Sequence, residues 1–266
     1  MSAGKAEKPP VSVCLITLNE ESNIRDCLES VKWAGEIVLV DSFSEDRTLD
    51  IAREYTDRVV QREWRGINDQ RQHCLELASN AWVLCVDADE RVTPELAEEI
   101  KGLFRSGKPA CDAFSMPRRT WYLGRWIRGS GWYPARKVRL FKKSAGRFGD
   151  NDPHDKVLVD GPIRKLKHDL LHYSYRDIAH HAATANSFST TAARVRFRKG
   201  KRGSLATMLF KPPWRFFWQY VLRGGFRDGV PGLVIGVLSA YTVFLRCAKL
   251  WEMTLAERKG QTPEAS

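Results

Sequence analysis

Short apolar runs alternate with segments of helical spacing along the first part of the chain. The run at residues 11–18 is rich in β-branched side chains, which is typical of a strand buried on both faces. After it, Ile24, Cys27, Leu28 and Val31 recur at the spacing of one helix face. The further expected strands are residues 36–41, 58–61 and 82–86, and the further expected helices are residues 48–55, 69–78 and a segment that begins near Thr93. This alternation predicts an α/β fold with a mostly parallel central sheet and right-handed crossovers.

The pattern changes after Gly107. Residues 111–116 and 137–141 are expected strands, joined by a loop rich in Trp, Arg and Gly. From Arg194 onward the chain is basic and aromatic, and residues 230–245 form an apolar segment bounded by charges. The expected division is a tail at residues 1–10, an α/β domain at 11–195, a basic, aromatic helical segment at 196–255 and a second tail at 256–266.

Three carboxylates stand directly after the apolar run that ends at Val86, in the sequence Asp87-Ala88-Asp89-Glu90. A buried strand ends in acids mainly where its tip binds a cation or a polar ligand, because desolvating unpaired carboxylates is costly. An Asp-x-Asp at such a tip suits Mg²⁺ or Mn²⁺ carrying a phosphorylated substrate. The plainer alternative is a solvated turn before the next helix.

Polar side chains also follow the two earlier strands. Thr17, Asn19 and Glu20 come after the first strand, and Asp41 ends the second. Adjacent parallel strands place their carboxyl ends side by side, so we expect these four residues to share one crevice with the acids after Val86. The chain has neither a Gly-x-Gly-x-x-Gly nor a Gly-Lys-Thr motif. A cation and basic side chains, rather than glycine amides, are therefore expected to neutralise phosphates.

The motifs at these strand ends resemble those of inverting glycosyltransferases of family 2. They are Thr-Leu-Asn-Glu at 17–20, Val-Asp-Ser-x-Ser-x-Asp-x-Thr at 40–48 and Asp-x-Asp-Glu at 87–90. Gln-Arg-Gln at 70–72 and Gly-Gly-Phe-Arg-Asp-Gly at 224–229 narrow the resemblance. They point to the branch that adds glucose or a related sugar to the inner core of lipopolysaccharide. The resemblance is specific over residues 11–92 and looser over 93–250.

The resemblance implies a nucleotide-sugar-binding fold of the glycosyltransferase A type, with residues 11–195 as the catalytic domain. It implies that Thr17 and Asp41 contact the base of the donor. Asp87 is implied as a contact of the ribose or the metal, and Asp89 as the ligand of a divalent cation that bridges the two phosphates.

Further side chains are expected at the donor and metal sites. Asn19, Glu20 and Arg71 are expected to bind the donor, and the alternative for Arg71 is an exposed helical residue. Many family members have Arg-Asn where this chain has Arg71-Gln72, so the contact made by Gln72 is open. His172 matches a family histidine that completes the metal site, although a histidine after apolar residues is often a hydrogen-bonded core residue.

Inversion at an anomeric carbon requires a base that deprotonates the acceptor hydroxyl as it attacks. Asp155, in a Pro-His-Asp-Lys motif where the family often has His-Glu, is the candidate catalytic base. The alternative is an acid of a surface turn, and Asp152 is the second candidate. Arg136 and Arg139 are expected either to bind diphosphate or an anionic acceptor, or to cover the sheet edge.

The net charge of +11 is concentrated near the C-terminal end. Ten Lys and Arg but no acid lie between Asp177 and Asp228. Together with the aromatic residues around Trp214, this stretch predicts an interfacial element on an anionic membrane leaflet. Residues 230–245 are too few to cross a bilayer, which needs about 20 apolar residues. The alternative is a pair of helices packed on the catalytic domain or in a dimer.

These observations predict a hexosyltransferase. It would transfer a hexose, with glucose expected, from a nucleotide-diphosphate sugar such as UDP-glucose to a lipid-linked acceptor such as the lipopolysaccharide inner core, using Mg²⁺ or Mn²⁺. An acceptor in polyprenyl phosphate, capsule or exopolysaccharide chemistry is the alternative. A basic nucleic-acid-binding module is the rival class, but it leaves the acidic crevice unexplained.

Cellular location is read from the start of the chain and from its cysteines. No apolar segment that would act as a secretory signal is visible at the start. The six cysteines show no paired spacing. These features favour a cytoplasmic enzyme, peripheral on the inner face of the cytoplasmic membrane.

Overall fold

The computed structural model describes residues 8–105, 107, 109–149 and 157–260. They fall into two compact units. The first contains residues up to Arg119 together with Ala135–His172, and the second contains Thr120–Pro134 together with the residues from Tyr173 onward. Each unit has its own secondary structure, and each is described by itself.

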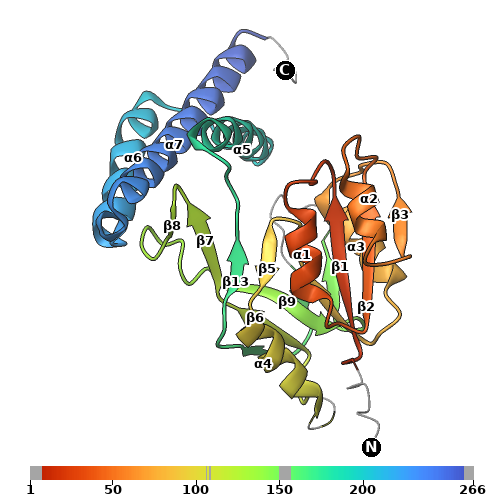
Figure 1. Ribbon diagram of the computed structural model, residues 1–266. Coiled ribbons are helices and arrows are strands. Elements are labelled where there is room, and N and C mark those ends of the chain that lie inside the picture. The colour runs from red at the N-terminus through yellow and green to blue at the C-terminus, as the bar shows by residue number, and fades with distance from the viewer. Residues whose placement is uncertain (1–7, 106, 108, 150–156, 261–266) are drawn as a thin grey trace, which may run out of the picture. The chain divides into compact units, whose positions relative to one another are not determined.

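The first unit is built on a seven-stranded sheet with the strand order β12-β6-β9-β4-β1-β2-β3. All neighbouring pairs are parallel except those made by β9, which is antiparallel to both β4 and β6. The strands are β1 (Val11–Thr17), β2 (Glu36–Asp41), β3 (Val59–Gln61), β4 (Trp82–Cys85), β6 (Ala113–Met116), β9 (Lys137–Lys142) and β12 (Ile163–Lys165). The mostly parallel sheet predicted from the alternating pattern is confirmed (Figure 1).

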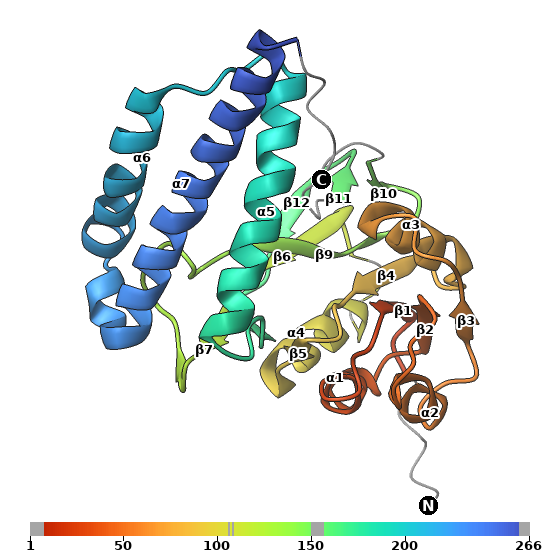
Figure 2. The same cartoon turned by 90° about the horizontal axis from the view of Figure 1, so that it is seen from above.

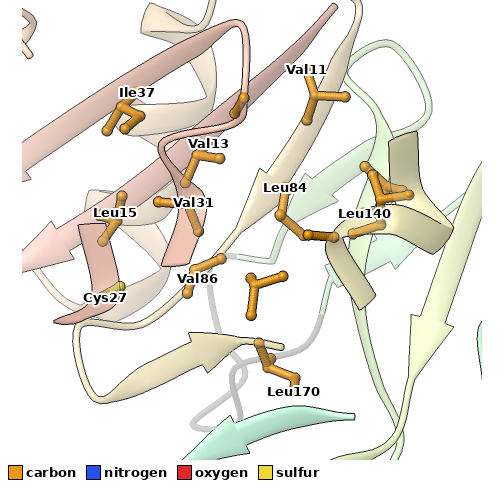
Figure 3. Packing of buried hydrophobic residues seen from close by; sticks show 14 of the residues in the cluster. Val11, Val13, Leu15, Cys27, Val31, Ile37, Leu84, Val86, Leu140 and Leu170 are labelled. Carbon is orange, nitrogen blue, oxygen red and sulfur yellow. The ribbon is translucent and has the colours of Figure 1, made fainter. Parts of the chain in front are cut away.

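Helices cover both faces of this sheet. The helices of the unit are α1 (Ile24–Val31), α2 (Thr48–Arg53), α3 (Ile67–Leu77) and α4 (Pro94–Arg105). One apolar cluster joins the buried side chains of α1, α2 and α4 to one face, and a second joins α3 to the other. Figure 3 shows part of the first cluster, where Val13 and Leu15 of β1 pack near Val31 of α1 and Leu84 of β4. The predicted cap of α4 is present, because Thr93 Oγ1 accepts the Leu96 N–H at 3.2 Å.

Short strands complete the first unit. β5 (Glu90–Val92) pairs antiparallel with β13 (Leu170–His172), with His172 opposite Glu90. β10 (Gly146–Phe148) pairs antiparallel with β11 (Val157–Val159). The β5–β13 pair is important for the site, because it brings a residue from late in the unit beside the acids that follow β4.

The second unit is mainly helical. Strand β7 (Arg118–Tyr122) reaches into it and pairs with β8 (Arg125–Trp126). The helices are α5 (Ile178–Arg198), α6 (Leu205–Phe217), a π-helical turn at Trp218–Leu222, a 3-10 turn at Gly225–Asp228 and α7 (Gly229–Arg258). Helices α5 and α6 both lie alongside α7 (Figure 2).

The Gly-Gly-Phe-Arg-Asp-Gly motif joins α7 to the loop after β8. Asp228 is fully buried and accepts the N–H of Gly129 at 2.6 Å and that of Arg128 at 3.1 Å. A Cβ atom on Gly129 would lie 2.3 Å from the carbonyl oxygen of Gly224, and one on Gly232 would lie 1.9 Å from that of Gly225. Glycine is therefore required at these positions because two backbone segments approach each other closely.

Helix α7 is longer than the apolar run suggested. Residues 230–245 continue into a helix of 30 residues, because Cys247 and Leu250 remain buried beyond Arg246. Lys249 Nζ also donates to Ser189 Oγ of α5 at 2.9 Å. Among the described residues, Gly225–Arg258 is the one helical stretch long and apolar enough to cross a membrane, so the sequence-based length argument against a crossing does not hold.

Candidate functional site

The carboxyl ends of β1, β2 and β4 lie side by side in the first unit. In the parallel pairing of β1 with β2, Thr17 is opposite Asp41, and in that of β1 with β4, Cys14 is opposite Cys85. The acids after β4 therefore follow the same edge of the sheet as the polar residues after β1 and β2. The predicted convergence of the three strand ends is confirmed as a matter of topology.

Asp41 organises the loop after β2. Its carboxylate is fully buried, and Oδ1 accepts hydrogen bonds from Thr17 Oγ1 at 2.9 Å and from Ser44 Oγ at 2.5 Å. Oδ2 accepts the N–H of Ser44 at 2.8 Å. Thr17 is buried as well. In this structure both residues shape the loop, and their predicted contact with the donor base stays a prediction.

Asn19 links the loops that follow β1 and β2. Its backbone has a positive φ of 55°, a conformation that Asn adopts more readily than most residues. Its N–H donates to Ser44 Oγ at 2.8 Å, and its Oδ1 accepts the N–H of Glu45 at 2.9 Å. Asn19 thus has a structural role that requires its side-chain amide and its tolerance of this backbone conformation.

Glu20 is the acid of the crevice whose pKa is raised. Its N–H donates to Thr48 Oγ1 at 2.8 Å, which fixes its position at the sheet edge. Partial burial raises the pKa of the Glu20 carboxyl, and the carboxylates of Asp89, Asp46 and Asp87 raise it further, although a hydrogen bond from Asn23 acts in the opposite direction. The crevice therefore concentrates negative charge, which a cation would relieve.

Asp87 lies between two buried arginines. Arg71 Nη2 contacts Asp87 Oδ1 at 2.5 Å, and Arg139 Nη2 contacts Asp87 Oδ2 at 2.5 Å. Burial alone would raise the pKa of Asp87, but the charges of Arg139 and Arg71 outweigh it and hold that pKa well below its usual range. Arg71 is only 5 % exposed, so the alternative of an exposed helical residue is wrong. Asp87 is a fixed carboxylate whose two oxygens already have cationic partners.

Glu90 extends this network into the interior. It is fully buried, and its Oε1 contacts Arg139 Nη2 at 2.9 Å and Arg118 Nη1 at 3.4 Å. Its Oε2 accepts the N–H of Asp87 at 3.1 Å. Arg139, only 1 % exposed, therefore joins Asp87 to Glu90. The expectation that Arg139 covers a sheet edge is wrong, because β9 lies inside the sheet between β4 and β6.

Asp89 and His172 form the second polar contact of the site. His172 Nε2 lies 3.2 Å from Asp89 Oδ2, because the β5–β13 pairing brings the two together. The Asp89 side chain is 27 % exposed and that of His172 is 12 % exposed, so both can be reached. A carboxylate and an imidazole next to a crevice that concentrates negative charge suit Mn²⁺ or Mg²⁺.

The described residues contain no group of three or more His, Cys, Asp or Glu positioned to hold a metal ion. Because both oxygens of Asp87 contact arginines, the Asp89–His172 pair is the candidate for binding a cation among the described residues. Phosphate oxygens and water would have to supply the remaining ligands, as is usual for Mg²⁺ sites. The ligand role predicted for Asp87 stays a prediction.

The candidate catalytic base, Asp155, lies outside the described residues, as does Asp152. Gln72, whose contact was open, accepts the N–H of Phe148 at 3.1 Å through its Oε1 and so ties α3 to β10. Sequence reasoning missed the Arg139–Glu90 pair. The signal for it was present in the charged residues of an otherwise apolar strand, which require buried partners.

A mostly parallel α/β sheet with an Asp-x-Asp at the carboxyl end of a buried strand is typical of nucleotide-sugar-dependent glycosyltransferases. Comparison with known protein families agrees with this. The model of the family described as "Glycosyl transferase family 2" matches residues 12–165, and the chain belongs to this family.

Several relatives resemble the chain over nearly its whole length. The lipopolysaccharide core biosynthesis glycosyltransferase LpsC of Rhizobium meliloti is 29% identical, over 97% of this chain and 98% of its own. An uncharacterized glycosyltransferase of Rickettsia bellii is 31% identical, over 92% of this chain and 87% of its own. Among solved structures, that of residues 1–349 of S. aureus TarS is 17% identical with a TM-score of 0.48, covering 96% of this chain and 93% of the solved chain.

Proposed function

We propose that the protein transfers a hexose, glucose in the first instance, with inversion from a UDP-sugar to a lipid-linked acceptor of the lipopolysaccharide inner-core type. The observation that supports this most is the Asp87 carboxylate held between Arg71 and Arg139, beside the reachable Asp89–His172 pair. The relative named as a lipopolysaccharide core biosynthesis glycosyltransferase supports the choice of acceptor, since its similarity extends over both units.

In this proposal the residues around Asp87 position the donor and those around Asp89 hold its diphosphate. Asp89 and His172 would hold Mg²⁺ or Mn²⁺, which when bound would stabilise the negative charge of the leaving diphosphate. Arg71 and Arg139 keep Asp87 ionised and in one orientation, so that it can accept a hydrogen bond from the donor without reorganisation. Glu90, buried behind Arg139, holds that arginine in place.

The chemical step is a displacement at the anomeric carbon. The acceptor oxygen forms a bond to that carbon while the bond to the β-phosphate oxygen breaks, and the nucleoside diphosphate leaves. Asp155 takes the proton of the acceptor hydroxyl. Asp155→Asn is then expected to lose turnover but to keep its affinity for the donor, because a base acts in the transition state. An equal loss of donor binding would instead assign Asp155 to the donor site.

The experiment that tests the donor assignment is a thermal-shift screen of nucleotide sugars with and without Mn²⁺, followed by transfer assays with the best donor. The expected result is stabilisation by UDP-glucose that needs the metal. Asp89→Asn should lose the metal-dependent part, whereas the matched variant Asp57→Asn, at an exposed site, should keep it. Stabilisation that is equal with and without metal would contradict the metal assignment.

The second unit is proposed to contact an anionic membrane surface, which would place the enzyme on the inner face of the cytoplasmic membrane. Large apolar side chains of α6 and α7 are exposed, among them Phe210 at 74 % and Val230 at 71 %. They share the unit with the ten basic residues of the acid-free stretch. Apolar burial and attraction of basic residues to anionic lipid act together in such elements.

Point variants test this contact better than deletion of the C-terminal helices. Removing residues from Leu205 onward would also remove Asp228, the buried partner of the Arg128 and Gly129 amides. Phe210→Ser is expected to weaken binding to vesicles of phosphatidylcholine with phosphatidylglycerol and to leave transfer to a water-soluble acceptor unchanged. Full-length protein that ignores such vesicles at low salt would contradict the membrane contact.

A further inference from the structure

A cavity of about 590 Å³ lies within the second unit, among α5, α6 and α7. Three basic side chains line it, namely Lys211 and Arg215 from α6 and Arg246 from α7. Aromatic rings, including those of Trp214 and Trp218, line it as well. The cavity is made entirely of residues of this unit, so its character does not depend on the donor site.

The positive charge of this cavity is not balanced by its own walls. None of the described residues that line it is Asp or Glu. Arg215 Nε is buried and has no hydrogen-bond acceptor among the described residues. Burial lowers the pKa of Arg215, and the nearby charges of Arg196 and Arg215 add to burial in lowering that of Arg246. Holding half-buried cations close together costs free energy, which an anion bound between them would offset.

The backbone that follows Arg215 is irregular. A π-helical turn at Trp218–Leu222 follows α6 directly, and such turns are frequent at functional sites. The Arg215 guanidinium lies 5.2 Å from the centre of the Trp218 ring, and that of Arg223 lies 4.6 Å from it. Stacking on an aromatic face leaves the planar donors of a guanidinium available at its edge.

The rim of the cavity is apolar and exposed. Phe188 and Trp214, which both line it, are 62 % and 61 % exposed. The exposed apolar side chains Phe210 and Phe217 lie on the same helix as Trp214. An occupant with an anionic head and apolar chains matches both the interior and the rim. Two guanidinium groups and an ammonium exceed the charge of one carboxylate, whereas a phosphate monoester carries about −1.5 to −2 near pH 7.

We propose that this cavity binds the phosphate headgroup of a membrane lipid, with Arg215 and Arg246 as its principal ligands. The inference rests on the membrane contact proposed above and deepens it. It turns a general attraction between a basic surface and an anionic leaflet into a site that distinguishes one phosphate headgroup from another. The proposed occupant is a lipid of the leaflet itself that carries a phosphate monoester, because its charge matches the three cations of the cavity.

The test compares two double variants that each remove two positive charges. Arg215→Gln with Arg246→Gln changes the cavity, and Arg198→Gln with Lys199→Gln changes exposed residues outside it. Each full-length protein is sedimented with phosphatidylcholine vesicles containing either phosphatidic acid, a monoester, or phosphatidylglycerol, a diester, at equal surface charge. Inorganic phosphate serves as a competitor in a separate series.

The wild-type protein is expected to bind the phosphatidic acid vesicles more tightly. The cavity variant should lose this preference, with binding to those vesicles about tenfold weaker or more, because charge-assisted hydrogen bonds are lost. The control variant should weaken on both vesicles alike and keep the preference. Inorganic phosphate should compete only at high concentration, since it lacks the apolar chains.

Other results would overturn the inference. Equal binding of wild-type protein to both vesicles, or an equal response of the two variants, would show that the cavity does not recognise the headgroup, while the general membrane contact would stand. Full competition by dilute inorganic phosphate would assign the cavity to a soluble phosphate. No binding to any anionic vesicle would remove the membrane contact itself. If circular dichroism shows that the cavity variant unfolds, Arg215→Lys with Arg246→Lys serves instead, and it should also weaken the preference, since it keeps the charge but loses the planar donors.

Discussion

The two units of this protein differ in whether their clustered charges are neutralised by neighbouring side chains. In the first unit, Asp87 and Glu90 are matched by arginines, with Arg139 in contact with both. In the second, the cavity among α5, α6 and α7 presents Arg215 and Arg246 and has no acid among the described residues that line it. A network that is matched internally holds its shape before any ligand arrives, whereas an unmatched one is completed by a ligand. The first is suited to positioning a substrate and the second to selecting a partner by charge.

The largest effect should come from breaking the matched network. Arg139→Leu removes one cationic partner of Asp87 and one of Glu90, which Arg118 still contacts, so the free energy of unfolding is expected to fall by about 3–5 kcal/mol. Chemical denaturation followed by fluorescence measures this. The exposed pair Arg25–Glu54 provides the control, and Arg25→Gln should leave the midpoint unchanged. A small effect of Arg139→Leu would mean that the contacts of Arg139 with Asp87 and Glu90 do not stabilise the fold.

The next largest effect is expected on turnover, with the stability of the fold unchanged. Asp89→Ala removes a partly exposed carboxylate that contributes little packing, so the fold should remain intact. Turnover with saturating donor and Mn²⁺ is expected to fall by about 100- to 1,000-fold, the usual cost of removing one group that stabilises developing charge. The measurement is a steady-state transfer assay beside a thermal melt. Near-normal turnover would remove Asp89 from the metal site.

The two units should also differ in their response to acid. Burial, with a smaller contribution from His180, lowers the pKa of His181 to about 4, and His181 Nδ1 lies 2.8 Å from the hydroxyl of Tyr122. Unfolded His titrates near 6.5, so between pH 6.5 and 4 the unfolded chain binds more protons and stability falls as the pH falls. The loss from His181 is at most about 3 kcal/mol. The depressed pKa of Asp87 also makes stability fall in acid, but mainly below the pKa of an unfolded Asp, near 3.9, so most of its loss lies outside this window.

Unfolding curves across that pH range test this difference. His181→Gln keeps a hydrogen-bonding side chain but does not titrate, so the slope of stability against pH should flatten in this variant. A slope that is the same in wild type and His181→Gln would show that another group is responsible.

The smallest expected effects come from removing one helix cap in each unit. Thr93 caps α4 in the first unit, and Asp177 caps α5 in the second by accepting the His180 N–H at 2.7 Å. Thr93→Ala and Asp177→Ala should each cost about 1 kcal/mol. Calorimetry then shows whether the units unfold separately. If they do, each variant should lower the melting temperature of its own unit only. A shift of both transitions by either variant would mean that the units unfold together.

Sequence patterns predicted the features of the fold that depend on residues close together in the chain. The strand ends at Thr17, Asp41 and Asp87 could be predicted because apolar runs stop abruptly at polar residues, and parallel order follows from the alternation with helices. The Asp89–His172 contact was reached only through the family resemblance, since 83 residues separate the two, as their numbering shows. No local pattern brings such residues together.

The position of Arg139 could not be predicted for a related reason. Its role depends on where β9 is inserted, and the antiparallel pairing of β9 with β4 is a property of the whole sheet. The same holds for the contact between Asp228 and the Gly129 amide, which joins residues far apart in the chain. The apolar run underestimates the length of α7, because Arg246 interrupts the run in the sequence while the helix continues, with Lys249 bonded to Ser189 of α5.

The direction of β9 has a consequence for how this sequence can change over evolutionary time. Because side chains alternate between the faces of a strand, inserting or deleting one residue within Lys137–Lys142 would turn Arg139 to the opposite face and an apolar neighbour toward Asp87. The pairing of β9 with β6 already contains one register shift, between Phe114 and Ser115 opposite Arg139, so a further insertion would require a second irregularity beside it. Substitutions along β9 can therefore accumulate one by one, but its length should be invariant among functional descendants, and a library of single-residue insertions should show a sharp gap there.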